Sequence, residues 1–176
     1  MSTKCMILNL TAADFIVRTA YQMGKTPLLP LFAAGLGANA TFLGFIVSAS
    51  TLTGLLLKPL FGMLSDRWGR WIWVFLGTLL FFVVPFFYLL VENSHQLLVL
   101  RLIHGTATAI YGPVTVAWVI EQVKEEDSLE SNCAERLGWF GMARSAGYML
   151  GPLLGAALLT VLEPEVVFVA IGLFSL

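Results

Sequence analysis

The chain is dominated by long stretches that contain no ionised residue. No Asp, Glu, Lys or Arg occurs between Lys25 and Lys58, between Arg70 and Glu92, between Arg101 and Glu121, or between Arg144 and Glu163. A hydrocarbon core of about 30 Å is crossed by about 20 helical residues. Each stretch therefore supplies most or all of one membrane-spanning segment, and the first contributes to two.

These stretches predict five complete spans and one that is cut short, at 11–34, 41–64, 71–91, 96–120, 137–162 and 166–176. The last is too short to cross a bilayer, so we expect the chain to be part of a longer protein or to end in a short interfacial tail. Barrel strands are disfavoured because the apolar runs lack period-two alternation. Backbone groups in lipid must be paired within the segment, so the expected fold class is an all-α, polytopic membrane helix bundle.

The positions of Lys and Arg predict the orientation of the bundle. Six of them fall at the N-terminus, at the end of the second span, or in the second and fourth loops: Lys4, Lys58, Arg67, Arg70, Lys124 and Arg136. The loops at 35–40, 92–95 and 163–165 contain none. We therefore expect a cytoplasmic N-terminus, in a plasma or inner membrane.

Composition adds two exclusions. Net charge is -1, so no basic surface indicates nucleic-acid binding. An intramembrane enzyme would need paired acids or a zinc-binding histidine pair within the spans, whereas His95 and His104 are nine residues apart and one lies in a loop. The sequence thus predicts no enzyme activity, no catalytic residue, and no metal or cofactor.

A short polar loop joins the second and third spans. It contains Gly62, Asp66, Arg67, Gly69 and Arg70. Gly62 would allow close helix approach, and Gly69 would allow a turn conformation barred to other residues. Asp66 can accept hydrogen bonds from amides at the start of the next helix, or pair with Arg67 or Arg70. An ordinary positive-inside turn is the simpler interpretation.

This pattern, Gly-x-x-x-Asp-Arg-x-Gly-Arg, resembles the signature loop between helices two and three of major facilitator transporters. The resemblance implies an N-terminal six-helix half of that fold, with the sixth helix truncated and the C-terminal bundle absent from this chain. It also implies that the loop is a conformational latch in the outward-facing state. Asp66 would carry the latch interaction, and Arg67 and Arg70 would support it.

The fourth span contains an ionised residue, Arg101. With His104, Gly105 and Ala107 it resembles the family's fourth-helix motif, although many members have Gln in place of His104. The resemblance implies that Arg101 assists proton transfer, since a cation within a span normally faces a cavity or a partner. The alternative is an arginine near the outer boundary that reaches water along its own stem.

The fifth span resembles the family's antiporter motif, with Ala156 where a second Gly is usual. The matching residues are Gly138, Gly147, Gly151, Pro152 and Gly155. Small residues at every fourth position from Ala143 predict a groove for close helix packing, and Gly138 lies off that groove. Generic small-residue packing is the alternative. The resemblance implies an exchanger, especially of the drug and proton type.

The first span carries Asp14, Arg18, Tyr21 and Lys25 within about 60° of one another on a helical wheel, with Gln22 beside them. Such a stripe is expected to face the bundle interior. Asp14 and Arg18 are spaced to pair along the helix, and a boundary ion pair near the inner headgroups is the alternative for these two.

The first helix lines the central cavity in the family, which implies roles for these side chains. The candidates for substrate contact are Arg18, Tyr21, Gln22, Lys25 and Arg144, and those for proton coupling are Asp14 and Arg101. No partner for Arg144 is evident from the sequence. Lys58 is expected to reach the inner surface. The aromatic residues of the third span are expected to contact lipid and the interface: Trp71, Trp73, Phe75, Phe81, Phe82, Phe86, Phe87 and Tyr88.

These features together predict a secondary active transporter that moves a small solute by alternating access, as a proton-coupled antiport or efflux system. Its expected partners are a small-molecule substrate, the proton, the lipid bilayer and the missing C-terminal half. The alternative is a non-transporting membrane sensor or assembly protein built on the same scaffold.

Overall fold

The computed structural model describes residues 3–126 and 130–175, and every regular element within them is helical. In chain order these are α1 (Thr3–Met23), η1 (Gly24–Leu28), α2 (Leu29–Gly35), α3 (Ala40–Trp68), α4 (Arg70–Phe87), η2 (Tyr88–Leu90), α5 (Ser94–Glu126), α6 (Glu130–Leu159) and α7 (Pro164–Phe174). The segment η1 is a kinked turn that contains a non-helical residue, and η2 is 3₁₀-helical. The predicted all-α helix bundle is confirmed.

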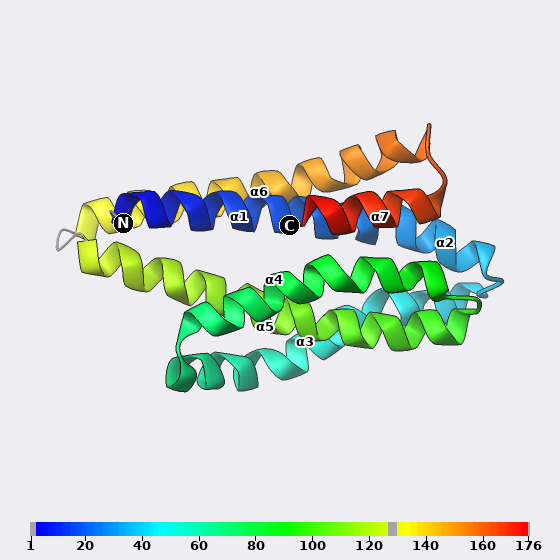
Figure 1. The fold of residues 1–176 in the computed structure, drawn as a ribbon, viewed down its shortest axis with the longest axis horizontal. Helices are drawn as coiled ribbons and strands as arrows, with labels where there is room; N and C mark the ends of the chain where they lie inside the picture. The colour runs from blue at the N-terminus through cyan, green and yellow to red at the C-terminus, as the bar shows by residue number, and fades with distance from the viewer. Residues whose placement is uncertain (1–2, 127–129, 176) are drawn as a thin grey trace.

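The helices lie lengthwise in the bundle, and the chain reverses direction at each of its ends (Figure 1). The N-terminus and the α3–α4 turn lie towards one end, and the α2–α3, α4–α5 and α6–α7 connections lie at the other. Helix α1 packs against α6, α3 against α5, and α4 against α5 and α7. Helix α1 also contacts α5 and α4, which joins the α1–α6 pair to the group formed by α3, α4 and α5. A site between these two groups is therefore built from segments far apart in the sequence.

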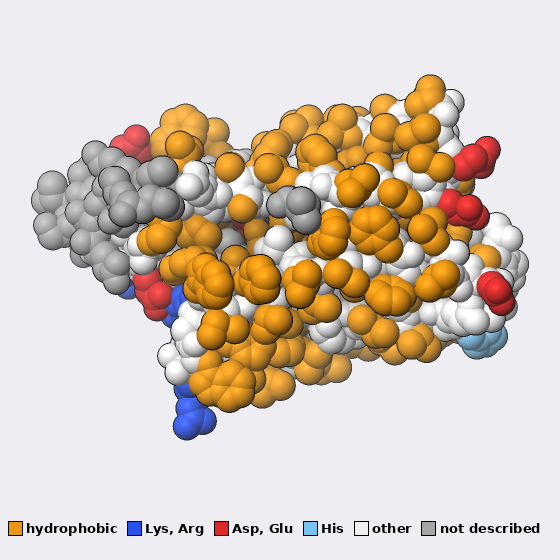
Figure 2. Space-filling model, in the orientation of Figure 1, with side chains coloured by type: hydrophobic (Ala, Val, Ile, Leu, Met, Phe, Trp, Pro, Cys, Tyr) orange, Lys and Arg blue, Asp and Glu red, His pale blue; other side chains and the backbone are white. Residues whose placement is uncertain are grey.

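Within the described residues, three helices are long and apolar enough to cross a membrane: Ala40–Trp68, Arg70–Leu90 and Ser94–Lys124. Figure 2 shows hydrophobic side chains across the middle of one face, with charged side chains mainly at the two ends. Large apolar side chains are exposed on the outside of α3 and α4, among them Leu56, Trp71 and Phe75. Exposure of such a surface to water would be unfavourable, whereas in a bilayer it contacts the apolar lipid chains.

The first predicted span, 11–34, is interrupted. Helix α1 ends at Met23, and Thr26 then has extended dihedral angles (φ -147°, ψ 122°) before α2 begins at Leu29. Pro27 explains the break, because proline has no amide hydrogen and disfavours a helical conformation of the residue before it. Lys25 lies within this irregular turn.

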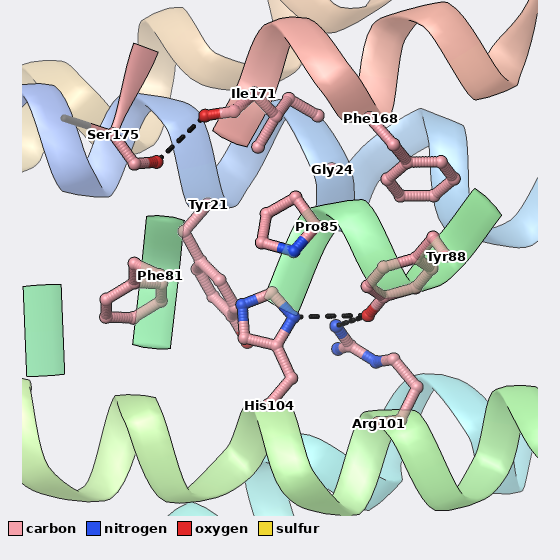
Figure 3. A pocket seen from close by; sticks show the side chains of 10 residues that line it. All are labelled: Tyr21, Gly24, Phe81, Pro85, Tyr88, Arg101, His104, Phe168, Ile171 and Ser175. Atoms are coloured by element: carbon pink, nitrogen blue, oxygen red, sulfur yellow. Dashed lines mark hydrogen bonds between the residues drawn. The ribbon is translucent and has the colours of Figure 1, made fainter. Parts of the chain in front are cut away.

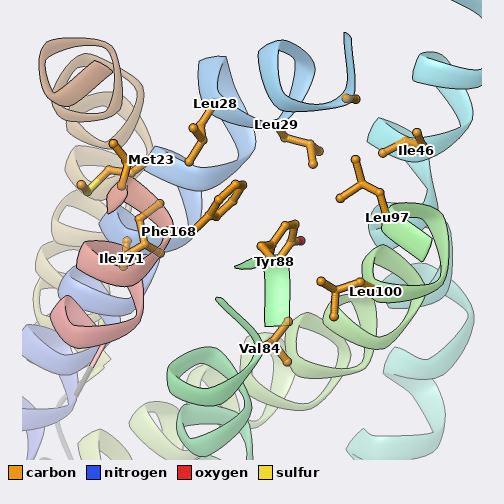
Figure 4. Close-up of a cluster of buried hydrophobic side chains, with 13 residues drawn as sticks. Met23, Leu28, Leu29, Ile46, Val84, Tyr88, Leu97, Leu100, Phe168 and Ile171 are labelled. Atoms are coloured by element: carbon orange, nitrogen blue, oxygen red, sulfur yellow. The ribbon is translucent and has the colours of Figure 1, made fainter. Parts of the chain in front are cut away.

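A buried hydrophobic cluster closes the end of the bundle away from the N-terminus (Figure 4). It joins residues of α1, η1, α2, α3, α4, η2, α5 and α7. At its centre the rings of Tyr88 and Phe168 are stacked, with centroids 4.3 Å apart and planes 13° apart. Lipid is as apolar as these side chains, so close packing rather than exclusion from water stabilises the cluster.

The expectation that the third-span aromatics contact lipid is only partly right. Trp71, Phe75 and Phe87 are exposed, whereas Trp73, Phe81 and Tyr88 are buried in the bundle. One face of α4 packs against α5 and α7. Successive residues of a helix are rotated by about 100° about its axis, so they point in different directions. An unbroken aromatic sequence therefore supplies both lipid-facing and interior side chains.

Candidate functional site

Asp14 of α1 is fully buried and forms a two-point ion pair with Arg144 of α6. Arg144 donates from Nε to Oδ2 at 2.8 Å and from Nη2 to Oδ1 at 2.7 Å. Arg18 Nε lies 3.6 Å from Oδ1, which is the pair that the spacing predicted. Two parallel charge-assisted bonds are strong and directional, so this contact holds α1 and α6 in register. It supplies the partner for Arg144 that the sequence did not reveal.

Arg18 extends from this ion pair towards two tyrosines. Its Nη1 donates to the Tyr148 hydroxyl at 3.3 Å, and its guanidinium carbon lies 5.7 Å from the ring centroid of Tyr111. The Tyr111 hydroxyl is buried and has no hydrogen-bond partner among the described residues. A guanidinium over an aromatic face is favourable, so the tyrosines keep Arg18 in place beside the carboxylate.

A polar pocket of about 390 Å³ opens beside this ion pair, between α1, η1, α3, α5 and α6. All five side chains predicted to contact substrate line it: Arg18, Tyr21, Gln22, Lys25 and Arg144. The other lining residues are Thr51, Gly54, Lys58, Thr108, Gly112, Pro113 and Tyr148. Its volume falls within the range of about 300–1,000 Å³ found for small-molecule sites. We call it the polar pocket.

Two lysines stand on the wall of the polar pocket. Lys25 Nζ donates to Thr51 Oγ1 at 3.4 Å and lies 5.9 Å from the ring centroid of Tyr21. Lys58 is exposed and also lines the pocket, a position that the sequence analysis did not predict. No Asp or Glu appears among the described residues that line the pocket.

Arg101 lies in a second polar group, beside Tyr88 and His104 (Figure 3). Only 2% of its surface is exposed, so the alternative of an arginine that reaches water along its stem is wrong. Its Nη1 donates to the Tyr88 hydroxyl at 3.4 Å, and its Nη2 donates to Ser50 Oγ. Ser50 in turn shares a hydrogen bond of 3.3 Å with the Tyr21 hydroxyl. Arg101 forms no ion pair with any carboxylate in the part of the chain that the structure describes.

His104 completes this group through a 3.1 Å hydrogen bond between its Nδ1 and the Tyr88 hydroxyl. Arginine can only donate, so the Tyr88 hydroxyl accepts from Arg101 and its own hydrogen can go to His104. The opposite ring nitrogen, Nε2, is buried without a partner in the described residues. A narrow cavity of about 10 Å³ beside these side chains has room for roughly one water molecule.

The loop between α3 and α4 is organised by Arg70. Its Nε and Nη2 donate to the two carboxylate oxygens of Glu121, each at 2.6 Å, and Nη2 also lies 2.9 Å from Asp66 Oδ1. Gly69 has φ 86°, a conformation that other residues rarely adopt, and it is the single residue between the two helices. Glu121, which the sequence analysis did not select, ties the loop to α5.

The structure distinguishes between the expectations for this loop. A Cβ added at Gly62 would meet no atom within 4 Å in the described structure, so no described helix lies close to this glycine. Of the contacts expected for Asp66, the structure contains the ion pair with Arg70, and the Asp66 side chain remains 60% exposed. No contact of Arg67 enters this ion-pair group.

The glycines of α6 lie against α1, as the four-residue spacing predicted. A Cβ at Gly147 would lie 3.0 Å from the Phe15 carbonyl oxygen, and one at Gly155 would lie 2.8 Å from that of Met23. A Cβ at Gly151 would lie 2.5 Å from Gln22 Cβ. Gly138 faces open space in the described structure, and α6 continues through Pro152 without a break. This groove lets α6 approach closely enough for Arg144 to reach Asp14.

The side chains that the sequence analysis missed are Lys58, Tyr88, Tyr111, Glu121 and Tyr148. Tyr88 stood in a run of aromatic residues and Glu121 at the end of a span, so neither differed from a lipid or loop residue in the sequence. In residues 3–126 and 130–175, no three His, Cys, Asp or Glu side chains gather closely enough to hold a metal ion.

Comparison with known proteins matches residues 12–176 to the family model of the Major Facilitator Superfamily. The chain is 26% identical over 129 residues to the quinolone resistance protein NorA of Staphylococcus aureus (strain MRSA252), which covers 73% of this chain and 32% of NorA. It is 28% identical over 134 residues to multidrug resistance protein 1 of Bacillus subtilis (strain 168), which covers 75% of this chain and 33% of that protein. The chain thus spans about a third of the length of the curated relatives it matches.

Proposed function

The chain belongs to the Major Facilitator Superfamily, and we propose that the full-length protein is a secondary active transporter that moves a small solute by alternating access. In this proposal the present residues form the N-terminal bundle. A second bundle, beyond this chain, supplies the other half of a central cavity near the middle of the membrane. The polar pocket is the N-terminal half of that cavity.

The observation that carries the proposal is the polar pocket itself. It holds four cationic side chains and two phenols, in a bundle that exposes many large apolar side chains. Ionised groups within a membrane bundle are unfavourable and normally face a cavity or a partner. Packing alone gives no reason for Lys25 and Lys58 to stand on this wall, and a route for a polar solute does.

We propose that transport is coupled to protons and that Asp14 is the coupling group. Its carboxylate accepts both hydrogen bonds from Arg144. Protonation would remove the charge that holds this pair and weaken the contact between α1 and α6. The pair borders the polar pocket through Arg18 and Arg144, so a change of protonation at Asp14 alters the pocket wall. Arg101, buried with Tyr88 and His104, is a second candidate for proton transfer.

Two further observations support antiport that exports the substrate. The glycine groove of α6, which resembles the family's antiporter motif, packs against α1 at the level of Arg18 and Gln22. The relatives' names refer to quinolone and multidrug resistance. We therefore propose antiport that exports its substrate in exchange for protons, with the N-terminus and the α3–α4 loop in the cytoplasm. Asp66, exposed in that loop, is the proposed latch.

The test uses the full-length protein in proteoliposomes that contain a pH-sensitive dye. A quinolone added against an imposed proton gradient should produce proton movement and accumulate in the acidic compartment. A protonophore should abolish accumulation, and empty liposomes should show none. A panel of uncharged, cationic and anionic solutes follows the same protocol. If no solute moves protons or accumulates, the transport proposal is wrong and the sensor or assembly role is favoured.

A further inference from the structure

The polar pocket carries charge of one sign only. Its charged lining residues are Arg18, Lys25, Lys58 and Arg144, and no carboxylate is among its described lining residues. A drug cation would meet four like charges on this wall. The charge pattern of the pocket therefore bears directly on the chemical class of its ligand.

The buried carboxylate behind the wall does not neutralise this charge. Asp14 has no exposed surface, and its single negative charge is shared between Arg144 and Arg18. Neither lysine pairs with Asp14: Lys25 donates to Thr51, and Lys58 forms no ion pair in the structure as described. The wall keeps a positive excess that solvent screens poorly inside a membrane bundle.

Neutral hydrogen-bonding groups surround the same space. The hydroxyls of Thr51 and Tyr148 belong to the lining. Each accepts a hydrogen bond, from Lys25 and Arg18 respectively, so its own hydrogen can be donated to an oxygen anion. Tyr21 adds an aromatic face beside Lys25. Cations, hydroxyl donors and an aromatic surface together form a suitable environment for a small carboxylate with an apolar body.

We propose that this pocket binds the anionic group of the substrate, that the substrate is a small organic anion, and that Lys25 and Lys58 are the charge partners of its carboxylate. Arg18 and Arg144 are held by Asp14 and set the positive potential without leaving that contact. This inference rests on the proposed function only in taking the pocket as the solute cavity, and it adds the ligand class that the fold leaves open.

The test compares three ligands of one shape and different charge: 2-naphthoate, 2-naphthamide and 2-naphthamidinium. Binding is measured by calorimetry on the full-length protein in neutral-lipid nanodiscs, so no transport is required. We expect 2-naphthoate to bind at least about tenfold more tightly than 2-naphthamide, because a charge-assisted hydrogen bond is worth roughly that factor. The amidinium should bind most weakly. Tightest binding of 2-naphthamidinium would overturn the proposal.

Two variants locate the effect. Lys25→Gln and Lys58→Gln should each weaken 2-naphthoate binding by about tenfold and leave 2-naphthamide binding unchanged. Lys124→Gln is the matched control, because Lys124 is exposed near the end of α5 and outside the pocket. If both pocket variants bind 2-naphthoate as the wild type does, the lysines are not its charge partners and the proposal is wrong.

The outcomes separate this inference from the proposed function. Selective, lysine-dependent binding of 2-naphthoate without solute-driven proton movement would support the anion site and overturn the transport mechanism. Proton-coupled movement of solutes with 2-naphthamide or 2-naphthamidinium preferred over 2-naphthoate would keep the transporter and overturn the anion site.

Discussion

Arg144 donates two hydrogen bonds to Asp14, a residue 130 positions earlier in the chain. The pair joins α6 to α1 next to the polar pocket, and the carboxylate is fully buried. Its geometry is the two-point arrangement that makes arginine–carboxylate contacts strong. Both arginines that contact Asp14, Arg18 and Arg144, also line the polar pocket.

Removal of the charge on Asp14 should destabilise the protein, because two arginines would lose their counter-ion. We expect Asp14→Asn to lower the free energy of unfolding by about 3–5 kcal/mol. The measurement is the thermal midpoint of the detergent-solubilised, full-length protein. Glu135→Gln is the control, since Glu135 is exposed near the start of α6, and it should behave as the wild type.

The double variant Asp14→Asn/Arg144→Gln tests whether the effect belongs to the pair. It should be more stable than the sum of the two single variants predicts, because it removes one of the two arginine charges that Asp14→Asn leaves unpaired. Additivity within about 0.5 kcal/mol would show that the two residues are not coupled.

The glycine groove offers a comparison within one motif. Gly151→Val should prevent α6 from approaching α1, since a Cβ there already lies 2.5 Å from Gln22 Cβ. Overpacking typically destabilises by about 1–3 kcal/mol, and a β-branched residue against backbone should reach the upper part of that range. A Cβ at Gly138 would meet no atom within 4 Å in the described structure, so Gly138→Val should be tolerated. Equal yields of monodisperse protein for both variants, measured by size-exclusion chromatography, would contradict the packing role.

Asp66 should matter for turnover and not for folding. Its side chain is 60% exposed and pairs with Arg70 at 2.9 Å, and exposed ion pairs contribute about 0–1 kcal/mol. Asp66→Asn is therefore expected to leave the thermal midpoint nearly unchanged and to slow transport in proteoliposomes. Unchanged transport kinetics would remove Asp66 from the latch.

Tyr88 should contribute more to stability than Tyr148, although the hydroxyl of each forms a hydrogen bond with an arginine. Tyr88→Phe leaves Arg101 Nη1 and His104 Nδ1 without their partner in a buried region, which should lower stability by about 1–3 kcal/mol. Tyr148 is 41% exposed and accepts one bond of 3.3 Å from Arg18. Tyr148→Phe is therefore the matched control, with an expected change below about 1 kcal/mol. The same thermal midpoint for both variants would refute the role of the Arg101 group.

The sequence by itself determined that the chain lies in a lipid bilayer and that its fold is all-helical. Uncharged stretches of about 20 residues favour lipid, and lipid requires helices because every backbone group must be paired within its own segment. Spacing along one helix also predicted the Asp14–Arg18 pair and the groove of small residues that begins at Ala143. These are local properties, since the 3.6-residue period sets which side chains share a face of the same helix.

The tertiary structure decided which faces meet. The helical period relates residues within one helix and leaves open how far each helix is rotated towards its neighbours. The pairing of Asp14 with Arg144, the tie from Arg70 to Glu121, the burial of Tyr88 and the place of Lys58 on the pocket wall all depend on that rotation. It is set by the packing of the whole bundle, where small residues let helices approach and bulky ones hold them apart.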